Sequence, residues 1–332
     1  MTDGAAVGSD PGAVAEWYRR FAAVEAAGSS PTYARLCTSI AGDVDVLARL
    51  ATLPPVKTQP NLLLAACRWL GAPFGSRAGF RAFVLDRWDD VHDVVMARST
   101  QTNEAARCAS LLPLLAGLPG PLALIEVGAS AGLCLQPDRY AYAYDGVEVG
   151  GASPVHLDVA TAGPVPAPDV VPEIAWRRGL DLHPLDVHDD GDVAWLDACI
   201  WPEHDARRQR LHAAVSLARA DPPPVVEGDL LDDLDELIDA SPPDATTVVF
   251  GSAVLVYLAR DDRRRFAAAM AGRDVVWITN EGPGIVEGLE GAGSPALAPP
   301  PFATSKASFT LAIDGRAVAA ADPHGSWVRW VG

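Results

Sequence analysis

The sequence predicts an α/β protein with a mostly parallel sheet, an antiparallel C-terminal edge and an all-helical N-terminal region. Three observations lead to this fold class. From residue 13 to about 118 the apolar residues recur at helical spacing. From residue 122 onward, strand-like runs alternate with helical ones, which is the order that builds a parallel sheet covered by helices. Residues 308–330 contain strand-like runs joined by tight turns, which predicts antiparallel pairing at the end of the chain.

Length and composition limit the possible functions. With 332 residues, 49% of them hydrophobic, the chain can bury a large core as one large domain or two ordinary ones. The net charge of -17 would repel phosphate groups, so we expect a small-molecule substrate and neither nucleic acid nor membrane as partner. The chain opens without a signal-peptide pattern, and its longest apolar run, 111–125, is broken by Pro and Gly. We therefore expect a cytoplasmic protein.

The N-terminal half predicts a flexible tail, residues 1–12, and a helical cap domain, residues 13–118. Its first helix starts at Ala13 and stops before Gly28, and a second begins with Ser30 as its cap and Pro31 at its first position. Further helices are predicted over 61–70, 80–98 and 103–115.

The second domain, residues 119–332, is predicted to hold the sheet. The predicted strands lie at 123–127, 174–182, 224–231, 246–258 and 274–281, with helices at 192–200 and 261–271. A hairpin insertion interrupts the series at about 138–170, where Asp145-Gly146 predicts a tight turn. Its three tyrosines, at 140, 142 and 144, share one face, which we interpret as a half-buried sheet face.

The segment L-I-E-V-G-A-S-A-G-L, residues 124–133, supports two functional hypotheses. The first is a nucleotide loop in which Gly128 and Gly132 let the backbone approach a ligand, with only small residues between them. Position 130 is Ser, so the middle glycine of the dinucleotide pattern G-x-G-x-x-G is missing. The acid at Glu126 better suits a ligand without a diphosphate, whose amino-acid end carries a cationic amine.

The second hypothesis is the nucleophile elbow of a serine hydrolase, G-x-S-x-G. It makes Ser130 the nucleophile, with a later Asp and His324 completing a triad in the expected chain order. The architecture argues against it, because a hydrolase elbow follows several strands and an oxyanion loop, and here the upstream region is helical.

Acids follow two further predicted strands, where ligands of open α/β sheets bind. Asp181 can accept from ribose hydroxyls, and Asp229 from an adenine amino group, with Leu230 against the ring. Each of these acids has an alternative role as a helix cap or turn residue.

Several longer motifs together resemble a known family. They are E-V-G-A-S-A-G-L, R-R-G-L-D-L-H-P-L-D-V, W-P-E-H, G-D-L-L, S-A-V-L-V-Y-L, N-E-G-P-G and D-P-H-G-S-W. These motifs are similar to those of an uncharacterised bacterial family of unknown function, over almost the whole chain. Over the α/β half, that family in turn resembles class I S-adenosylmethionine-dependent methyltransferases. The resemblance implies a Rossmann-like fold that binds S-adenosyl-L-methionine through Glu126, Gly128, Ala129, Ser130, Gly132, Asp181, Leu182, Asp229, Leu230 and Ser252.

The resemblance also implies methyl transfer to a small molecule, a reaction that needs a well-placed acceptor and at most one proton acceptor. Glu281 and His324 are the candidate catalytic groups, with Asn280 beside the acceptor; alternatively, Glu281 is a solvated loop acid and His324 a turn residue. A non-catalytic nucleoside-binding or sensing module remains open, as does the hydrolase.

A polar segment precedes the first strand and contains Thr102, Asn103, Glu104 and Arg107. It is either a lid over the site or a helix N-terminus capped by Thr102 or Asn103. No metal site is expected, because the histidines lack the spacing of metal ligands.

Overall fold

The computed structural model describes residues 9–293, 297–303 and 307–331. The chain forms two compact units: a helical unit of residues 1–102 and 190–209, and a sheet unit of residues 103–189 and 210–332. The domain limits predicted from the sequence differ from these units in two segments, 103–118 and 190–209, and remain predictions. The first eight residues of the predicted tail lie outside the described residues.

The helical unit contains seven α-helices and the start of another among its described residues. They are α1 (Pro11–Arg20), α2 (Pro31–Ile40), α3 (Val44–Leu50), α4 (Pro60–Trp69), α5 (Arg77–Asp86), α6 (Trp88–Ala97), α8 (Asp190–Cys199) and the beginning of α9 (Asp205–Ala220). α8 packs on α4, which explains why residues 190–209 group with the N-terminal helices.

Local sequence signals predicted one helix start correctly and missed one helix break. Ser30 is the N-cap of α2, because its side chain accepts the N–H of Tyr33, and Pro31 is the first helical residue. The single helix predicted over 80–98 is two helices, α5 and α6, separated at Arg87 with φ of -117° and ψ of 31°. No Gly or Pro marks this break, so the periodic pattern continued across it.

The sheet unit contains one 11-stranded sheet in the order β3-β2-β4-β11-β10-β9-β8-β7-β1-β5-β6. Its strands are β1 (Leu122–Val127), β2 (Ala141–Tyr144), β3 (Val147–Val149), β4 (His156–Ala162), β5 (Ile174–Asp181), β6 (Val225–Glu227), β7 (Thr246–Ser252), β8 (Val276–Glu281), β9 (Phe309–Ile313), β10 (Arg316–Ala321) and β11 (Trp327–Trp330). The pairs β6-β5, β5-β1, β1-β7 and β7-β8 are parallel, whereas β8-β9, β9-β10 and β10-β11 are antiparallel. The predicted fold class is therefore confirmed.

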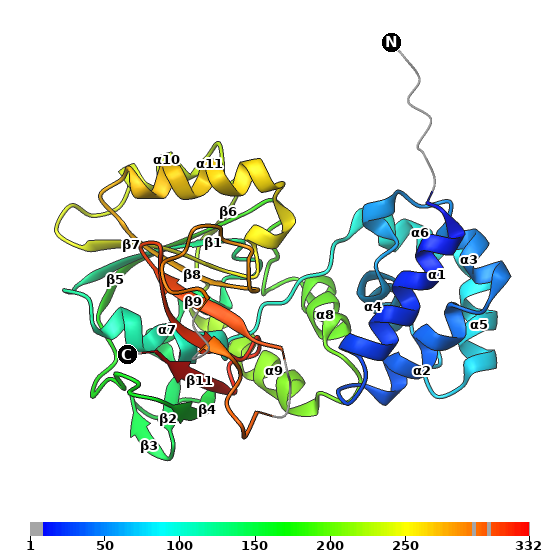
Figure 1. Cartoon of the computed structure of the whole chain (residues 1–332), viewed down its shortest axis with the longest axis horizontal. Coiled ribbons are helices and arrows are strands. Elements are labelled where there is room, and N and C mark those ends of the chain that lie inside the picture. Colours follow the sequence, from blue (N-terminus) through cyan, green and yellow to red (C-terminus); the bar gives the residue numbers. More distant parts are fainter. Residues whose placement is uncertain (1–8, 294–296, 304–306, 332) are drawn as a thin grey trace, which may run out of the picture. The chain divides into compact units, whose positions relative to one another are not determined.

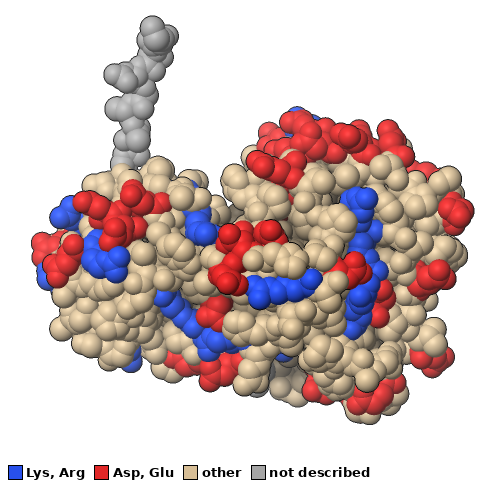
Figure 2. Space-filling view, turned by 180° about the vertical axis from the view of Figure 1, so that it is seen from behind, with Lys and Arg blue, Asp and Glu red and all other residues tan. Residues whose placement is uncertain are grey.

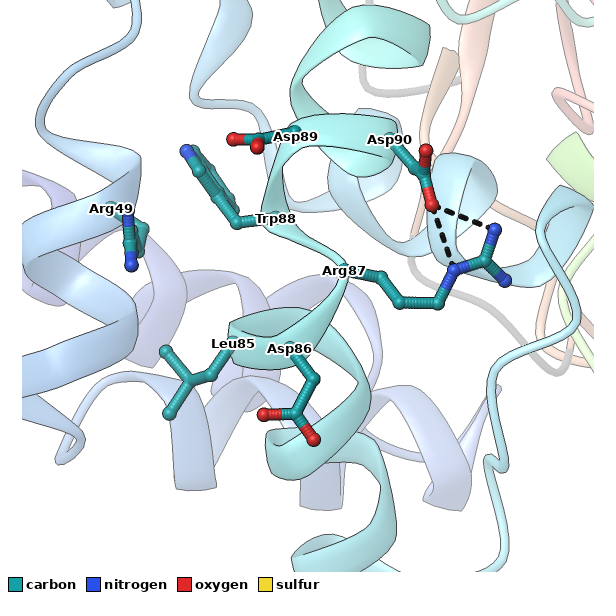
Figure 3. Close-up of a pocket in the computed structure, with 7 residues that line it drawn as sticks. All are labelled: Arg49, Leu85, Asp86, Arg87, Trp88, Asp89 and Asp90. Atoms are coloured by element: carbon teal, nitrogen blue, oxygen red, sulfur yellow. Dashed lines mark hydrogen bonds and ion pairs between the residues drawn. The ribbon is translucent and has the colours of Figure 1, made fainter.

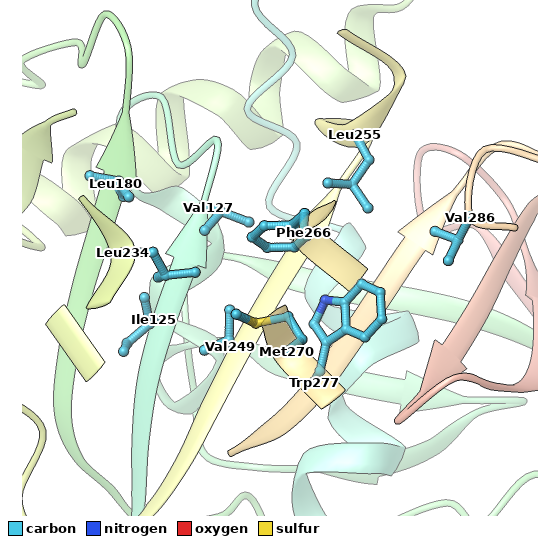
Figure 4. Close-up of a cluster of buried hydrophobic side chains, with 10 residues drawn as sticks. All are labelled: Ile125, Val127, Leu180, Leu234, Val249, Leu255, Phe266, Met270, Trp277 and Val286. Carbon is cyan, nitrogen blue, oxygen red and sulfur yellow. The ribbon is translucent and has the colours of Figure 1, made fainter. Parts of the chain in front are cut away.

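Helices α10 (Leu234–Asp239) and α11 (Arg260–Ala271) cover one face of these parallel strands, and α7 (Arg107–Ala116) lies on the other side (Figure 1). Under α10 and α11, strand residues such as Ile125, Val127 and Val249 pack against Phe266 and Met270 (Figure 4). Because side chains alternate along a strand, the residues between them point toward α7. This alternation determines which strand residues, Glu126 among them, lie on the α7 side of the sheet.

The hairpin insertion holds more structure than the sequence predicted. β2 and β3 pair across the Asp145-Gly146 turn as expected, but β4 was not predicted and joins β2 to β11. Tyr140, Tyr142 and Tyr144 are fully buried rather than half-buried, and their hydroxyl groups donate to backbone carbonyls of Leu133, Pro137 and Ala109. The tyrosine face is therefore part of the core and holds the chain that follows the glycine turn.

Candidate functional site

The carboxyl ends of five neighbouring parallel strands form one edge of the sheet. Their order is β6-β5-β1-β7-β8, so the chain passes outward from β1 to β5 and β6, then returns to the other side of β1. In open α/β sheets, ligands bind outside the carboxyl ends where the strand order reverses. That point lies between β1 and β7, so the turns after these strands are the first place to expect a site.

The turn after β1 is held by β5. The N–H of Gly128 donates to the carbonyl of Leu180 at 2.8 Å, and the N–H of Ser130 donates to Oδ2 of Asp181 at 2.8 Å. Ser130 has a φ of 54°, an uncommon conformation for a residue with a side chain. A short 3₁₀ turn, Leu133–Leu135, follows instead of an α-helix, so this loop does not present a helix N-terminus to a ligand.

The room that we expected Gly128 and Gly132 to leave for a ligand is filled by the protein. A Cβ on Gly128 would lie 2.5 Å from Cγ2 of Val254, and one on Gly132 would lie 2.7 Å from Cγ of Pro223. Both glycines have a φ of 70°, which also favours glycine. Among residues 128–132 only Gly128 is not buried, so a ligand can reach this turn only there.

The two acids predicted for ribose and adenine, Asp181 and Asp229, lie at the ends of the adjacent strands β5 and β6. Each accepts the backbone N–H two residues further along, at 2.8 and 2.7 Å, and Asp181 also accepts that of Ser130. They therefore have the turn roles given above as alternatives. A carboxylate has about four acceptor sites, so both keep capacity for a ligand. Beside them Leu182 is 58% exposed and Leu230 is half-buried.

Glu126 is buried in the interior of this edge. It is 4% exposed, and its position between Ile125 and Val127 directs it to the α7 side of the sheet. Its Oε2 has no hydrogen-bond donor. Burial raises the pKa of Glu126 well above its usual range, Cys134 raises it further, and Arg107 lowers it. A donor or positive charge beside this oxygen would stabilise the carboxylate.

Arg107, the first residue of α7, connects the turns of this edge. It is 6% exposed, and its Nε donates to the carbonyl of Pro323 while Nη1 donates to that of Ser252, both at 3.0 Å. Its charge also lowers the pKa of both Glu126 and Glu281. Four motifs that are distant in sequence therefore meet around one guanidinium group.

Asn103 fixes both ends of the glycine turn. Its Nδ2 donates to the carbonyl of Ala129 at 3.1 Å, and its Oδ1 accepts the N–H of Leu133 at 2.9 Å. The N-cap position of α7 is Ala106, without a side-chain cap, so the expectation that Thr102 or Asn103 caps the helix is wrong. Thr102 is exposed and belongs to the other unit.

Glu104 forms a buried ion pair within the sheet unit. It is 5% exposed, and its Oε1 accepts from Nε of Arg210 at 2.6 Å. Asn103, Glu104 and Arg107 are all buried in this structure. The hypothesis that this segment is a lid remains a prediction.

The ends of β7 and β8 are joined by side chains. The Ser252 hydroxyl donates to the backbone carbonyl of Asn280, and Nδ2 of Asn280 donates to that hydroxyl, both at 3.2 Å. Oε1 of Glu281 accepts the N–H groups of Val254 and Leu255 at 2.8 and 2.9 Å. Burial raises the pKa of Glu281, and these amides partly oppose the effect. Glu281 is therefore not a solvated loop acid.

His324 lies in the turn between β10 and β11, which contacts the start of α7. Its N–H donates to Oδ1 of Asp322 at 2.8 Å, and a Cβ on Gly325 would lie only 2.0 Å from the carbonyl oxygen of Ala106. This turn therefore brings His324 to the same edge of the unit as Arg107.

Three features of the site had no clear signal in the sequence. Arg107 was expected either in a lid or at a helix N-terminus, and its position in the interior depends on long-range contacts. Val254 covers Gly128, although both lie in motifs that the sequence singled out. Cys134 is buried close to Glu126 and raises the pKa of that carboxyl group. Its place two residues after the glycine turn is the signal that could have indicated this contact.

These features define an α/β protein with a polar, largely buried edge at its strand-order reversal. The family model for uncharacterized proteins conserved in bacteria (DUF2332) matches residues 15–78 and 73–330. The chain belongs to this family. No curated protein matches the chain.

The remaining sequence predictions concern membrane, metal and nucleic acid binding and the location of the protein. Among the described residues, no helix is long and apolar enough to cross a membrane, and no group of three or more metal-ligating side chains occurs. On the face drawn in Figure 2, basic side chains lie in short groups with acidic ones nearby. The absence of nucleic acid partners and the cytoplasmic location remain predictions.

A hollow of about 430 Å³ lies in the helical unit, formed by Arg49 of α3 and residues 85–90 around the α5–α6 break (Figure 3). Arg87 and Asp90 in its wall pair with each other. None of the predicted site residues lines it.

Proposed function

We propose that the sheet unit binds S-adenosyl-L-methionine at the β1/β7 reversal point and transfers its methyl group to a small-molecule acceptor. The observation that carries this proposal is the buried Oε2 of Glu126, which has no donor and lies within electrostatic reach of Asp181. A ligand with a cationic amine supplies both the missing donor and a compensating charge.

The residues of this edge fit the groups of such a ligand. Asp181 and Asp229 are partly exposed and can accept from ribose hydroxyls and an adenine amino group. The side chains of Leu182 and Leu230 offer apolar surface to a ring. Gly128 is the accessible point of the glycine turn.

The cofactor, when bound, supplies an already activated methyl group. The chain's residues then have to orient the acceptor, exclude water and, for some acceptors, take up a proton. Arg107 orders the turns after β7 and β10. Glu281 keeps one carboxyl oxygen without a donor and is the candidate proton acceptor, with His324 as the other candidate.

Calorimetry with S-adenosylhomocysteine tests the proposal. We expect binding by the wild type, at least tenfold weaker binding by Leu182→Asp, and unchanged binding by Val147→Asp. Val147 is a matched control because it is an exposed apolar residue of the same unit, 66% exposed on β3. Absence of heat with the wild-type protein would refute the proposal.

A serine hydrolase is the second candidate, and the φ of 54° at Ser130 favours it because a nucleophile elbow holds its serine on a strained turn. A fluorophosphonate probe that labels Ser130, with loss of labelling in Ser130→Ala, would support this alternative. Binding of S-adenosylhomocysteine without methyl transfer to any metabolite of a broad panel would instead support a sensing module.

A further inference from the structure

The hollow beside the break between α5 and α6 belongs to the helical unit, and no residue of the proposed cofactor site lines it. The two helices are interrupted at Arg87, and Arg49 of α3 and residues 85–90 surround a space of about 430 Å³ (Figure 3). This volume falls within the range of about 300–1,000 Å³ that is usual for small-molecule sites. The hollow is therefore large enough for a small metabolite.

Three charged side chains of this hollow have no ion-pair partner and no side-chain hydrogen bond among the residues that the structure describes. They are Arg49, Asp86 and Asp89. The other two charged residues of the wall, Arg87 and Asp90, pair with each other at 2.8 Å. Figure 3 shows that pair on one side of the α5–α6 connection and the three unpaired side chains on the other. One side of the wall therefore presents a cation and two anions that do not neutralise each other.

Trp88 supplies an apolar ring and a hydrogen-bond donor to the same hollow. It is 6% exposed, and its indole N–H has no acceptor within the described part of the chain. In Figure 3 the indole nitrogen points away from the α5–α6 connection, on the side where Arg49 and Asp89 lie. The N–H of a largely buried Trp usually has a partner, so this donor is available to a ligand. Half-buried Leu85 adds apolar surface.

The donors and acceptors of this wall select the charge of the ligand. The Arg49 guanidinium and the Trp88 N–H are donors, and a guanidinium group can bind both oxygens of a carboxylate. Asp86 and Asp89 only accept, which suits an ammonium group. A ligand with a carboxylate alone would be repelled by the two aspartates, and a ligand with an amine alone would be repelled by the arginine. A ligand that carries both charges avoids both repulsions.

We propose that this hollow binds a small zwitterion with an apolar side chain, which is the charge pattern of a free α-amino acid. The carboxylate of the ligand binds Arg49 and the Trp88 N–H, and its ammonium group binds Asp86 and Asp89. Its side chain contacts Leu85 and the ring of Trp88. This site is independent of the proposed function, because all its residues belong to the helical unit.

The test compares three ligands of similar shape by calorimetry with the full chain. They are L-leucine, 4-methylpentanoate, which lacks the amino group, and 3-methylbutylamine, which lacks the carboxylate. We expect leucine to bind at least tenfold more tightly than either of the others, because each of them leaves one set of charges unpaired.

Arg49→Met and Asp86→Asn should each weaken the binding of leucine at least fivefold, because each removes a charge that the ligand pairs with. Both residues are exposed, so the fold should persist in both variants. Arg77→Met is the matched control, because Arg77 is an exposed arginine at the start of α5 that does not line the hollow. It should leave the affinity for leucine unchanged.

Equal binding of leucine and 3-methylbutylamine would indicate a site for cations alone, and equal binding of leucine and 4-methylpentanoate a site for anions alone. Either result would overturn the proposal. So would the absence of heat with leucine, or an affinity for leucine that is the same in Arg49→Met as in the wild type. None of these outcomes depends on whether S-adenosylhomocysteine binds, so this proposal and the proposed function can fail separately.

Discussion

The polar motifs of the helical unit and of the sheet unit differ in how completely their carboxyl oxygens are hydrogen-bonded. In the helical unit, Glu203 of W-P-E-H accepts hydrogen bonds on both oxygens, from the N–H of Thr32 at 2.9 Å and from the hydroxyl of Ser30. In the sheet unit, Glu126 and Glu281 each keep one buried oxygen without a donor. The first motif therefore has a complete explanation in folding, since it ties residues 201–204 to the start of α2.

The motifs of the sheet unit do not have such an explanation. Glu126, Asn280 and Glu281 each hold a buried oxygen without a donor, and the buried guanidinium of Arg107 lowers the pKa of the two glutamates. Buried acceptors without donors reduce stability, so selection for folding alone would remove them. A polar motif of this chain is therefore evidence for a ligand where its hydrogen bonds remain incomplete, as at Glu126 and Glu281.

Of the changes considered, replacing Arg107 should lower the stability of the sheet unit most. Arg107→Met removes the donors that Arg107 supplies to the carbonyls of Ser252 and Pro323 and removes the charge that lowers the pKa of Glu126. We expect a loss of about 3–5 kcal/mol in the free energy of unfolding of the sheet unit. Urea denaturation measures it.

The control for this change is Arg260→Met, because Arg260 is an exposed arginine of the same unit that pairs with Glu287. It should leave the midpoint of the urea transition unchanged, because an exposed ion pair adds little to stability. Equal effects of the two substitutions on stability would show that the buried Arg107 contributes no more to stability than the exposed Arg260.

The contact between the D-P-H-G-S-W turn and α7 provides the next test. Gly325→Ala places a Cβ 2.0 Å from the backbone oxygen of Ala106 at a φ of 79°, so the turn has to move. We expect a loss of about 3 kcal/mol in unfolding free energy. Gly315→Ala has the same φ of 79° with nothing within 4 Å, and should lose only about 1 kcal/mol. Similar losses for the two variants would contradict the close contact.

Glu126→Gln should change the pH dependence of stability. Burial, the largest cause, raises the pKa of Glu126 in the folded protein. A raised folded pKa means that stability from this group is full below the unfolded pKa and is lost as the pH rises through the folded pKa. Gln does not titrate, so the variant should gain about 1–2 kcal/mol relative to wild type toward high pH. Urea titrations from pH 5 to pH 9 measure the difference, and a gain that shrinks with rising pH would contradict the burial of this carboxyl group.

Local signals in the sequence predicted much of the fold. The cap Ser30, the Asp145-Gly146 turn and the strand before Gly128 each depend on neighbouring residues, and all three occur as expected. The break at Arg87 was missed because no Gly or Pro marks it. Strand β4 was missed because it depends on pairing with β2 and with β11, which is far away in sequence.

The site could be predicted only in part for a related reason. The positions of Glu126, Asp181 and Asp229 at or near the carboxyl ends of β1, β5 and β6 follow from the strand ends, which the sequence pattern indicates. Filling of the space at Gly128 by Val254 depends on how two turns meet, and a glycine in sequence does not tell whether a ligand or a side chain occupies that space.

The smallest expected effect on stability is that of changing Glu203 in W-P-E-H, whose two carboxyl oxygens both accept hydrogen bonds. Burial alone would raise the pKa of Glu203, but hydrogen bonds from Ser30 and Thr32 outweigh it and lower the pKa. A lowered folded pKa gives stability that is present above the unfolded pKa and is lost as the pH falls through the folded pKa. Because Glu203 is largely exposed, Glu203→Gln should lose only about 0.5–1 kcal/mol at pH 7, measured by urea denaturation, and less at pH 3.

Glu16→Gln on α1 is the matched control, because Glu16 is an exposed acid of the same unit that pairs with Arg19, three residues away. It should change stability by less than about 0.3 kcal/mol at pH 7. Since Glu126→Gln is expected to gain stability where Glu203→Gln loses it, the two acids should respond to rising pH with opposite signs. If the stability differences of both variants changed with pH in the same direction, Glu203 and Glu126 would not differ in the way proposed here, as a fully hydrogen-bonded carboxyl group and one with a donor-less oxygen.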